Sequence, residues 1–399
     1  MRVVILGGAG LMGKGIALDL LSEQSEDVTA VVVADSNKKA LSGLNEAIQD
    51  KRFSVFHIDV READAVRDIL SEAQVCINAV PTFAGLQMDI FKASLDAGCP
   101  YIDLGGMGIY TQKQKDLHPL WQDAGLSAVL GCGADPGMSN VLCKAVAEKL
   151  DSIENINLFW AGKIVGPDSP VLIPLYNIYT LLAEYHNSSW QFLDGKLREQ
   201  PAQSGHETII LPEPFGETEF MFSQHSEPLT VPFAKGIAEK GINEMTWKLH
   251  LPEQDDRIWK SLVKAGFGSF DEPVDLNGMK VSPGELLSAV ISRNIERNHE
   301  RLPEQEDYQI HFAVGHGECG GLPTTVRATV TSVPDEFFSE YHDAGTSMNA
   351  SIAAQLLVRQ EGQAGVFSPE EFFDVSRYFA ELKKRRFKIT LDVCTDVPV

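Results

Sequence analysis

The sequence has little of what nucleic-acid-binding and membrane proteins require. Lysine and arginine number 34 against 56 aspartates and glutamates, so the formal net charge is −22. That excess of acid argues against a basic surface for nucleic acid or for an anionic membrane. No apolar run approaches the length of a membrane span. We therefore expect neither nucleic acid nor a membrane as a partner.

Cysteine is also scarce, and the six residues are scattered: Cys76, Cys99, Cys132, Cys143, Cys319 and Cys394. There is no C-x-x-C pair and no histidine at metal-ligand spacing, so we expect no metal site. The first predicted strand begins at residue 2, which leaves no room for a signal peptide. These features predict a cytoplasmic protein with reduced thiols.

The first motif in the chain is a glycine motif at residues 8–13. Gly8-Ala9-Gly10-Leu11-Met12-Gly13 follows the apolar run 3–6 and precedes the helical run 16–21. The spacing G-x-G-x-x-G between a strand and a helix is typical of a dinucleotide site. Gly8 would allow the tight turn, Gly10 would let the backbone approach a pyrophosphate, and Gly13 would let the helix pack closely. The helix N-terminus would then meet the phosphates.

An acid follows at the spacing that such a site needs. The apolar run 28–34 ends at Asp35, close to the distance at which an acid reaches a ribose 2′-hydroxyl. The alternative is a glycine turn that binds nothing, with Asp35 as a helix N-cap. Asp35 would repel a 2′-phosphate, which favours NAD as the cofactor. Lys38 and Lys39 could compensate such a phosphate, so NADP stays possible.

Further strands alternate with helices along the first third of the chain. Because such strands are joined by crossovers, they predict an α/β fold with a Rossmann-type, doubly wound parallel sheet. Ligands bind at the carboxyl ends of these strands, so the following residues should share one rim. Asp59 and Val60 would lie near an adenine, or Asp59 would cap the helix 62–71. The remaining strands are expected at 53–58, 75–80, 101–104 and 127–130, and the fourth strand contributes Asn78, Ala79, Val80 and Pro81 to the cofactor site.

The pattern changes after the sixth strand. The run 131–140, Gly-Cys-Gly-Ala-Asp-Pro-Gly-Met-Ser-Asn, is dense in turn residues and is either a linker or part of the site. Beyond residue 152, short alternating runs predict an α+β domain with a mixed or antiparallel sheet. One of the expected strands is 229–232, and a helix is expected over 112–123 in the first domain.

Several motifs together resemble the saccharopine dehydrogenase family: the glycine motif, residues 78–81, residues 101–105 and, most specifically, 131–140. The resemblance implies a nicotinamide-dependent oxidoreductase that acts on a carbon–nitrogen bond of an amino acid or polyamine. Lysine 6-dehydrogenase and carboxynorspermidine dehydrogenase activities are alternatives within it. It also implies an inserted second domain and a homodimer. The domains would be 1–137 (dinucleotide-binding), 138–346 (substrate-binding and dimerisation) and 347–399 (returning to the first domain).

Oxidation of an amine needs a base, because hydride leaves the carbon only when the nitrogen lone pair is free. Asp103 and Asp135 are the acids at the rim where both domains should meet, so they are the catalytic candidates. For each, the alternative is structural: Asp103 would cap the following turn, and Asp135 would fix its loop. An S-adenosylmethionine methyltransferase and a non-catalytic nucleotide-binding protein are the competing functions.

Overall fold

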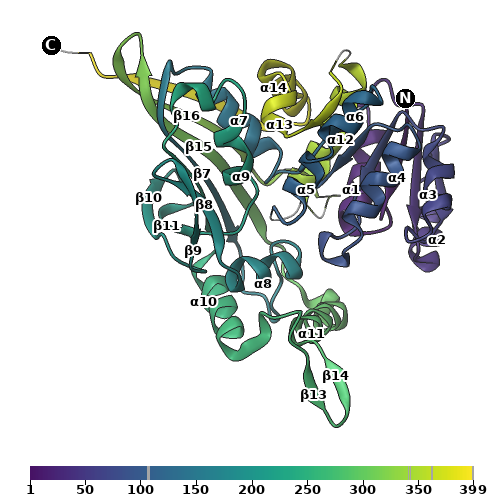
Figure 1. Ribbon diagram of the computed structural model, residues 1–399. Helices are drawn as coiled ribbons and strands as arrows, with labels where there is room; N and C mark the ends of the chain where they lie inside the picture. The colour runs from purple at the N-terminus through teal and green to yellow at the C-terminus, as the bar shows by residue number, and fades with distance from the viewer. Residues whose placement is uncertain (106–107, 340, 342, 361–362, 398–399) are drawn as a thin grey trace.

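The computed structural model describes residues 1–105, 108–339, 341, 343–360 and 363–397. Two β-sheets stand side by side, with helices between them and on the outer face of the first (Figure 1). The first third of the chain, drawn in purple and blue, forms one sheet with its helices. The teal and green segments form the second sheet.

The first sheet is entirely parallel in the described residues, with the strand order β17-β6-β5-β4-β1-β2-β3. This arrangement confirms the predicted fold class. Val3 and Ile5 of β1 pack into one core cluster, and Val4 and Leu6 pack into another. Both faces are therefore covered, as parallel sheets require. The strands are β1 (Arg2–Leu6), β2 (Ala30–Asp35), β3 (Phe53–His57), β4 (Val75–Asn78), β5 (Tyr101–Asp103), β6 (Ser127–Val129) and β17 (Gly365–Phe367).

Helices cover the two faces of this sheet. On one face α1 packs against α12, and on the other α3 packs against α4. The expected helix over 112–123 is two helices, α5 and α6, because Pro119 in the first turn of α6 lacks the N–H that a continuous helix needs. The bounds are α1 (Leu11–Leu21), α2 (Lys38–Ala47), α3 (Ala63–Leu70), α4 (Gln87–Asp96), α5 (Thr111–Lys115), α6 (His118–Asp123) and α12 (Ala344–Arg359).

The second sheet is mixed, as predicted. Strands β12 and β7 are parallel, and the other pairs are antiparallel, in the order β10-β11-β12-β7-β15-β16-β18, with β8 pairing to β12 and β9. The hairpin β8–β9 was not predicted. The strands are β7 (Ser152–Val165), β8 (Ser189–Leu193), β9 (Lys196–Gln200), β10 (Glu207–Leu211), β11 (Gly216–Phe222), β12 (Glu244–His250), β15 (Glu306–Cys319), β16 (Leu322–Ser332) and β18 (Lys388–Thr395).

Helix α7 lies on the face of this sheet that looks toward the first sheet, against β7, β15 and β16 (Figure 1). The expected strand over 229–232 is wrong. Residues 227–233 form a helical turn and a 3-10 turn, each with a proline in its first turn, where a missing N–H costs nothing. The helices are α7 (Met138–Ala147), α8 (Ile178–His186), α9 (Glu227–Thr230), α10 (Glu253–Leu262) and α11 (Pro283–Asn298), and β13 (Val274–Leu276) pairs with β14 (Met279–Val281).

The C-terminal segment 347–399, called the tail below, is divided between the two sheets. Strand β17 pairs with β6 of the first sheet, as the predicted return requires. Strand β18 instead pairs with β16 of the second sheet, so the last part of 347–399 does not return to the first domain. Helices α13 (Pro369–Phe372) and α14 (Val375–Lys384) lie between β17 and β18 along the chain. The boundaries 1–137 and 138–346 stay a prediction.

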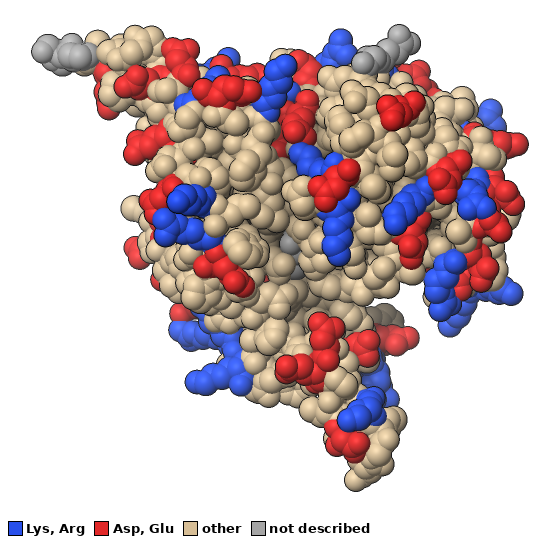
Figure 2. Space-filling view, in the orientation of Figure 1, with Lys and Arg blue, Asp and Glu red and all other residues tan. Residues whose placement is uncertain are grey.

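One hydrophobic core joins the two sheets. It runs from Val3 and Ile5 through α12 and α7 to Trp247 of the second sheet. Short helical turns complete the chain: Thr82–Ala84, Val231–Phe233, Ala238–Lys240, Val263–Phe267, His299–Arg301 and Glu336–Phe338. In the face shown in Figure 2, acidic and basic side chains are interspersed, without one extended basic patch. None of the helices in the described ranges has the length and apolar character that a membrane span needs.

We predict a homodimer that forms through the second sheet. Strand β10 is an edge of this sheet, and its Ile210 is 81% exposed, while Val393 of β18 is 51% exposed. Open edges with apolar side chains favour pairing with another chain. Light scattering should give a mass of about twice the 43.8 kDa of one chain. A single chain at working concentrations would contradict this prediction.

Candidate active site

The glycine motif forms a compact turn between β1 and α1. Gly7 has a positive φ of +72°, and a Cβ at Gly8 would lie 2.9 Å from the carbonyl oxygen of Ile5 and 2.9 Å from Cγ1 of Val33, so the tight turn depends on both glycines. A Cβ at Gly13 would lie 2.4 Å from the Cα of Gly8, which explains why the helix needs glycine there. A Cβ at Gly10, the residue that precedes α1, would meet only the Gly7 carbonyl oxygen, at 3.3 Å. The backbone at Gly10 is thus open to a ligand.

Asp35 lies against this turn. Its carboxylate accepts hydrogen bonds from the backbone N–H of Ala9 at 3.1 Å and from that of Asn37 at 2.9 Å. The N-cap of α2 is Asn37 and not Asp35, so the capping alternative for Asp35 is wrong. Leu11 is 59% exposed at the start of α1, and Met12 is half-buried beside it.

The third and fourth strands end at the same edge. Asp59 is held by Arg61, whose guanidinium hydrogen bonds lower the pKa of this half-buried carboxyl to about 2. The helix that follows is capped at Glu62, so Asp59 is not its N-cap. Val60 is half-buried against the outer core cluster.

The fourth strand leads into a loop beside the glycine turn. A Cβ at Gly7 would lie 2.8 Å from the backbone nitrogen of Val80 and 2.9 Å from the carbonyl carbon of Ala79. Buried Asn78 fixes this loop by accepting a hydrogen bond from the N–H of Val80 at 3.1 Å. Exposed Pro81 then leads into a 3-10 turn. The structure therefore brings residues 78–81 and the glycine motif together.

Asp103 is buried and surrounded by hydrogen-bond donors. Its carboxylate accepts from the side chains of Gln87, Gln114 and Tyr101 and from the backbone N–H groups of Gly105 and Gly131. Only 1% of the residue is exposed. Five donors on one carboxylate fix the loops after β5 and β6, and they leave little room for a substrate. This geometry favours the structural alternative for Asp103.

Asp135 has a different environment, because it faces the second sheet. Its Oδ2 lies 2.6 Å from Nδ1 of His311 on β15, and the two side chains are 10% and 6% exposed. Burial alone would raise the pKa of Asp135. The charge and hydrogen bonding of His311, with smaller effects of His225 and Trp247, outweigh it and hold the pKa below its ordinary value. Asp135 is thus an ionised carboxylate between the two sheets.

A second set of buried polar groups lies close by. Nε2 of His225 is 3.1 Å from Glu184 on α8, and its Nδ1 is 3.4 Å from Glu227 on α9. Glu184 also accepts a hydrogen bond from Tyr176, and Glu227 accepts one from Ser139 at 2.7 Å. We call Glu184, His225 and Glu227 the acid–histidine cluster. The His225 ring stacks on Trp247, with 3.5 Å between ring centroids.

This cluster should make the stability of the protein sensitive to alkaline pH. Burial lowers the pKa of His225, but Glu227 and Glu184 together raise it to about 10 from an ordinary 6.5. A raised pKa stabilises the folded state fully below pH 6.5, and the stabilisation is lost as pH rises through about 10. Urea unfolding should therefore show a free energy that falls over this range. In His225→Gln the free energy of unfolding should fall less over this pH range than in the parent. The same pH dependence in variant and parent would contradict the raised pKa of His225.

Sequence reasoning missed every partner of Asp135 on the second sheet. His311 alternates with the apolar Ile310 and Phe312, so the sequence pattern assigns it to a polar face, whereas residues 310–313 are all buried in the structure. Glu184 is likewise a buried acid inside an otherwise apolar helix. For His225, in the segment between β11 and α9, the local sequence offers no signal.

An aromatic contact links the two parts of the chain beside this region. The ring of Phe83, which follows the loop 78–81, stacks with Tyr179 of α8 at 6.4 Å and with Phe270 at 6.2 Å. Tyr179 and Phe270 also stack with each other, 4.8 Å apart. The contact brings the predicted cofactor loop next to the helix that carries Glu184.

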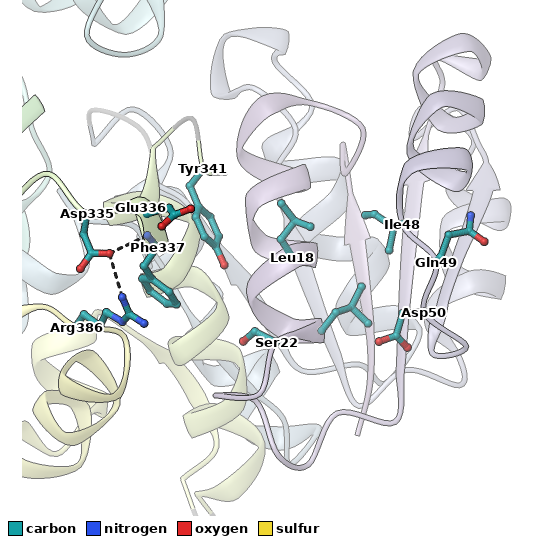
Figure 3. Close-up of a pocket in the computed structure, with 11 residues that line it drawn as sticks. Leu18, Ser22, Ile48, Gln49, Asp50, Asp335, Glu336, Phe337, Tyr341 and Arg386 are labelled. Atoms are coloured by element: carbon teal, nitrogen blue, oxygen red, sulfur yellow. Dashed lines mark hydrogen bonds and ion pairs between the residues drawn. The ribbon is translucent and has the colours of Figure 1, made fainter. Parts of the chain in front are cut away.

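A separate pocket of about 580 Å³ lies elsewhere (Figure 3). Leu18 in the C-terminal half of α1 and Ser22, which caps that helix, line it on one side, and Arg386, paired with Asp335 at 3.0 Å, lines it on the other. It is at the opposite end of α1 from Gly10, and no predicted site residue lines it. We therefore assign it neither to cofactor nor to substrate. Among the residues that the structure describes, no group of three or more His, Cys, Asp or Glu is arranged to hold a metal ion.

Comparison with known proteins identifies the family. Residues 3–129 match the saccharopine dehydrogenase NADP-binding domain, and residues 133–387 match the saccharopine dehydrogenase C-terminal domain. The chain belongs to the saccharopine dehydrogenase family. This confirms the resemblance seen in the sequence.

Three proteins similar to this saccharopine dehydrogenase family member share 15–23% sequence identity with it. A carboxyaminopropylagmatine dehydrogenase of Synechocystis sp. is 23% identical, over 96% of this chain and 95% of its own. A probable mitochondrial saccharopine dehydrogenase-like oxidoreductase of Arabidopsis thaliana is 23% identical over 33% of this chain and 32% of its own. The structure of saccharopine dehydrogenase (L-Glu forming) from Saccharomyces cerevisiae superposes with a TM-score of 0.70 over 98% of this chain and 99% of that one, at 15% identity. At that identity the superposition shows the shared fold.

The first domain of this family member binds NAD(P). The residues present fit a dinucleotide: the backbone at Gly10 is open, α1 begins immediately after it, and the carboxylate of Asp35 stands beside the turn. The helix N-terminus supplies free N–H groups for phosphates, and the acid suits a ribose diol. We expect the rim residues 78–81 to lie along the same ligand.

We predict a preference for NAD over NADP, because the Asp35 carboxylate would repel a 2′-phosphate. Asp35→Ser should weaken this preference by about tenfold, or ~1.4 kcal/mol. The ratio of kcat/KM for the two cofactors measures it in the parent and the variant. A parent enzyme that prefers NADP more than about tenfold would show that the argument from Asp35 is wrong.

Proposed function

We propose that this member of the family oxidises or reduces a carbon–nitrogen bond in an amine-bearing amino acid or a polyamine. The observation that carries the proposal is the buried pair of Asp135 and His311, where the loop after β6 meets β15. That loop is at the carboxyl edge of the parallel sheet, the edge at which such folds bind ligands. A buried carboxylate with an imidazole beside it is suited to attract a cationic amine and to move its proton.

The chemistry assigns a separate task to each group. A bound nicotinamide ring supplies the hydride acceptor or donor. The carboxylate of Asp135 attracts the substrate ammonium and holds it at the rim. When the imidazole of His311 is neutral, the proton that the nitrogen must lose passes to the Asp135–His311 pair, whose two groups are in contact and then share that one proton. Asp103, which already has five donors, orders the loop that carries Asp135.

The names of the relatives suggest where to look for a substrate. Carboxyaminopropylagmatine dehydrogenase covers almost the whole chain, although its identity is only 23%. Lysine 6-dehydrogenase and carboxynorspermidine dehydrogenase activities are the finer alternatives within the same reaction class. A dimeric, cytoplasmic enzyme is part of the proposal.

A panel of amines tests it. Saccharopine, lysine, carboxynorspermidine and carboxyaminopropylagmatine should be assayed with NAD⁺ and NADP⁺, following the nicotinamide absorbance. We expect turnover of at least one of them. NADH binding, followed by quenching of tryptophan fluorescence, is measured on the same sample. Tight binding without turnover of any C–N substrate would favour the non-catalytic alternative and contradict the proposal.

A further inference from the structure

Three aromatic rings meet where the loop 78–81 approaches the second sheet. Phe83, on the 3-10 turn Thr82–Ala84, stacks with Tyr179 at a centroid distance of 6.4 Å and with Phe270 at 6.2 Å, and the ring planes differ by 27° and 23°. Tyr179 and Phe270 stack with each other at 4.8 Å and 20°. Phe83 follows β4 of the first sheet, whereas the other two rings belong to the part of the chain that forms the second sheet. We call Phe83, Tyr179 and Phe270 the aromatic triad.

On the side of the first sheet, the backbone that carries Phe83 is fixed. The hydroxyl of Thr82 donates a hydrogen bond to the carbonyl oxygen of Gly105 at 2.7 Å, so the turn is tied to the loop after β5. Val80, three residues before Phe83, lies against the glycine motif, because a Cβ at Gly7 would be 2.8 Å from its backbone nitrogen. The Phe83 ring is therefore a short extension of the loop that we expect along the dinucleotide.

On the side of the second sheet, the backbones that carry the other two rings are fixed as well. Tyr179 lies in the first turn of α8, and its N–H donates to the side chain of the N-cap residue Asn177 at 2.9 Å. Phe270 lies on the backbone at the start of α11, since a Cβ at Gly284 would be 2.6 Å from its ring. The N–H of Gly284 donates to the carbonyl oxygen of Ser269 at 3.0 Å. The triad thus joins two firmly anchored segments.

The contact between these segments is itself weak. Phe83 is 40% exposed, and within the described residues neither Phe83 nor Tyr179 belongs to a hydrophobic core cluster. The core that joins the two sheets passes instead through α12 and α7, and α8 and α11 lie at the other end of the second sheet (Figure 1). One stacked pair shifts an equilibrium by about 2- to 12-fold. The triad is therefore strong enough to favour one arrangement of the two parts and weak enough to open repeatedly.

We propose that the aromatic triad is a latch on the NAD(P) site. It holds the loop 78–81 against α8 while the dinucleotide is bound, and it opens before the dinucleotide leaves. Phe83 is thus a positioning residue that acts through its loop, and Tyr179 gives the second part of the chain control over cofactor release. Opening steps of this kind limit turnover in many enzymes. The inference concerns the cofactor alone, so it goes beyond the proposed function and does not depend on which amine reacts.

The rate of cofactor release tests the latch. The enzyme is loaded with NADH, or with NADPH if it prefers that form, and is mixed with excess oxidised cofactor in a stopped-flow fluorimeter. The loss of fluorescence gives the rate constant of release. Phe83→Ala breaks two stacked pairs and should raise it by about tenfold or more, and Tyr179→Ala, which breaks one pair to Phe83, by about threefold or more. Unchanged release in both variants would overturn the inference.

The double variant shows whether the two rings act through their contact. If they do, Phe83→Ala with Tyr179→Ala should release the cofactor no faster than Phe83→Ala alone, because the contact is already lost in the single variant. Rate increases that multiply would mean that each ring acts separately, and they would overturn the inference. Tyr179→Phe keeps the ring and should release the cofactor at the parent rate.

Phe233→Ala is the matched control. Phe233 is 54% exposed and meets Phe192 edge to face at 5.5 Å, so this variant also removes an exposed ring, but its contact lies within the second part of the chain. It should leave cofactor release unchanged, and urea unfolding checks that every variant is folded. The amine panel keeps the two proposals apart. Unchanged release with turnover of an amine would overturn only the latch, whereas faster release without turnover of any amine would overturn only the proposed function.

Discussion

Asp135→Asn is expected to lower kcat by about 10²-fold or more, while NADH binds with nearly unchanged affinity. The variant keeps the shape of the side chain but removes the charge that attracts the ammonium and shares its proton with His311. Because the charge of His311 keeps the pKa of Asp135 low, the parent carboxylate is ionised at neutral pH and attracts the ammonium by its charge. The amide can do neither task.

The pH dependence separates a role in proton transfer from a structural role. A free alkyl ammonium titrates near pH 10.4, so more substrate arrives already neutral as pH rises. The rate deficit of Asp135→Asn should therefore narrow with increasing pH in an amine that tolerates alkali. Urea unfolding and NADH titration serve as controls, and Asp392→Asn on the exposed face of β18 is the matched variant that should be neutral. A near-normal rate in Asp135→Asn would assign the proton to another group.

The first sheet could be predicted almost strand by strand because its signals are local. Most of its strands are short apolar runs buried on both faces, the exposed edge strand β3 being the exception, and helices follow at short spacings. The errors lie where backbone chemistry overrides hydrophobicity. The prolines at 228 and 232 turned an expected strand into helical turns, and Pro119 divided a helix.

The cofactor half and the substrate half of the candidate site also differ in how far the sequence predicts them. The rim residues could be placed because parallel strands all end at one edge, which follows from topology alone. The run 131–140 was recognised as specific, yet its contacts were not predictable. Ser139 reaches Glu227, 88 residues away, and Asn140 reaches Glu370, 230 residues away. Pairings at such separations depend on the packing of the second sheet against the first, which no local pattern encodes.

Asp103 shows why the residue type alone did not decide its role. In the sequence both aspartates at the rim were candidates, with Asp135 slightly favoured because its motif is more specific. The structure distinguishes them by their neighbours: Asp103 accepts five hydrogen bonds from its own domain, whereas Asp135 is turned toward a histidine of the other sheet. The number of donors around a carboxylate is a property of the folded chain.

Arg385→Ala is expected to destabilise the protein by about 3–5 kcal/mol, because it leaves an uncompensated buried charge. Arg385 follows α14 in the tail, and its guanidinium binds both oxygens of Asp19 on α1, at 2.8 Å from Nε and from Nη2. Both residues are 0% exposed. Nη1 also donates to Glu381 at 3.0 Å. The cluster ties the tail to the helix whose N-terminus faces the cofactor.

The neighbouring arginine is the matched control for Arg385. The side chain of Arg386 is 59% exposed and pairs with Asp335 at 3.0 Å, so Arg386→Ala should cost at most about 1 kcal/mol. Free energies of unfolding from urea titration measure both. Equal effects of the two variants would contradict the role assigned to burial.

A double variant separates the strength of the ion pair from the penalty of breaking it. Asp19→Leu with Arg385→Met replaces the paired charges by apolar side chains of similar size. It should recover much of the stability that Arg385→Ala loses, because no buried carboxylate is then left unpaired. If the double variant is as unstable as the single one, the pair itself contributes the stabilisation. In either case, a variant in which α1 shifts should bind NADH more weakly. Asp19 and Gly10 belong to one turn–helix unit, and the C-terminal segment holds that unit against the sheet.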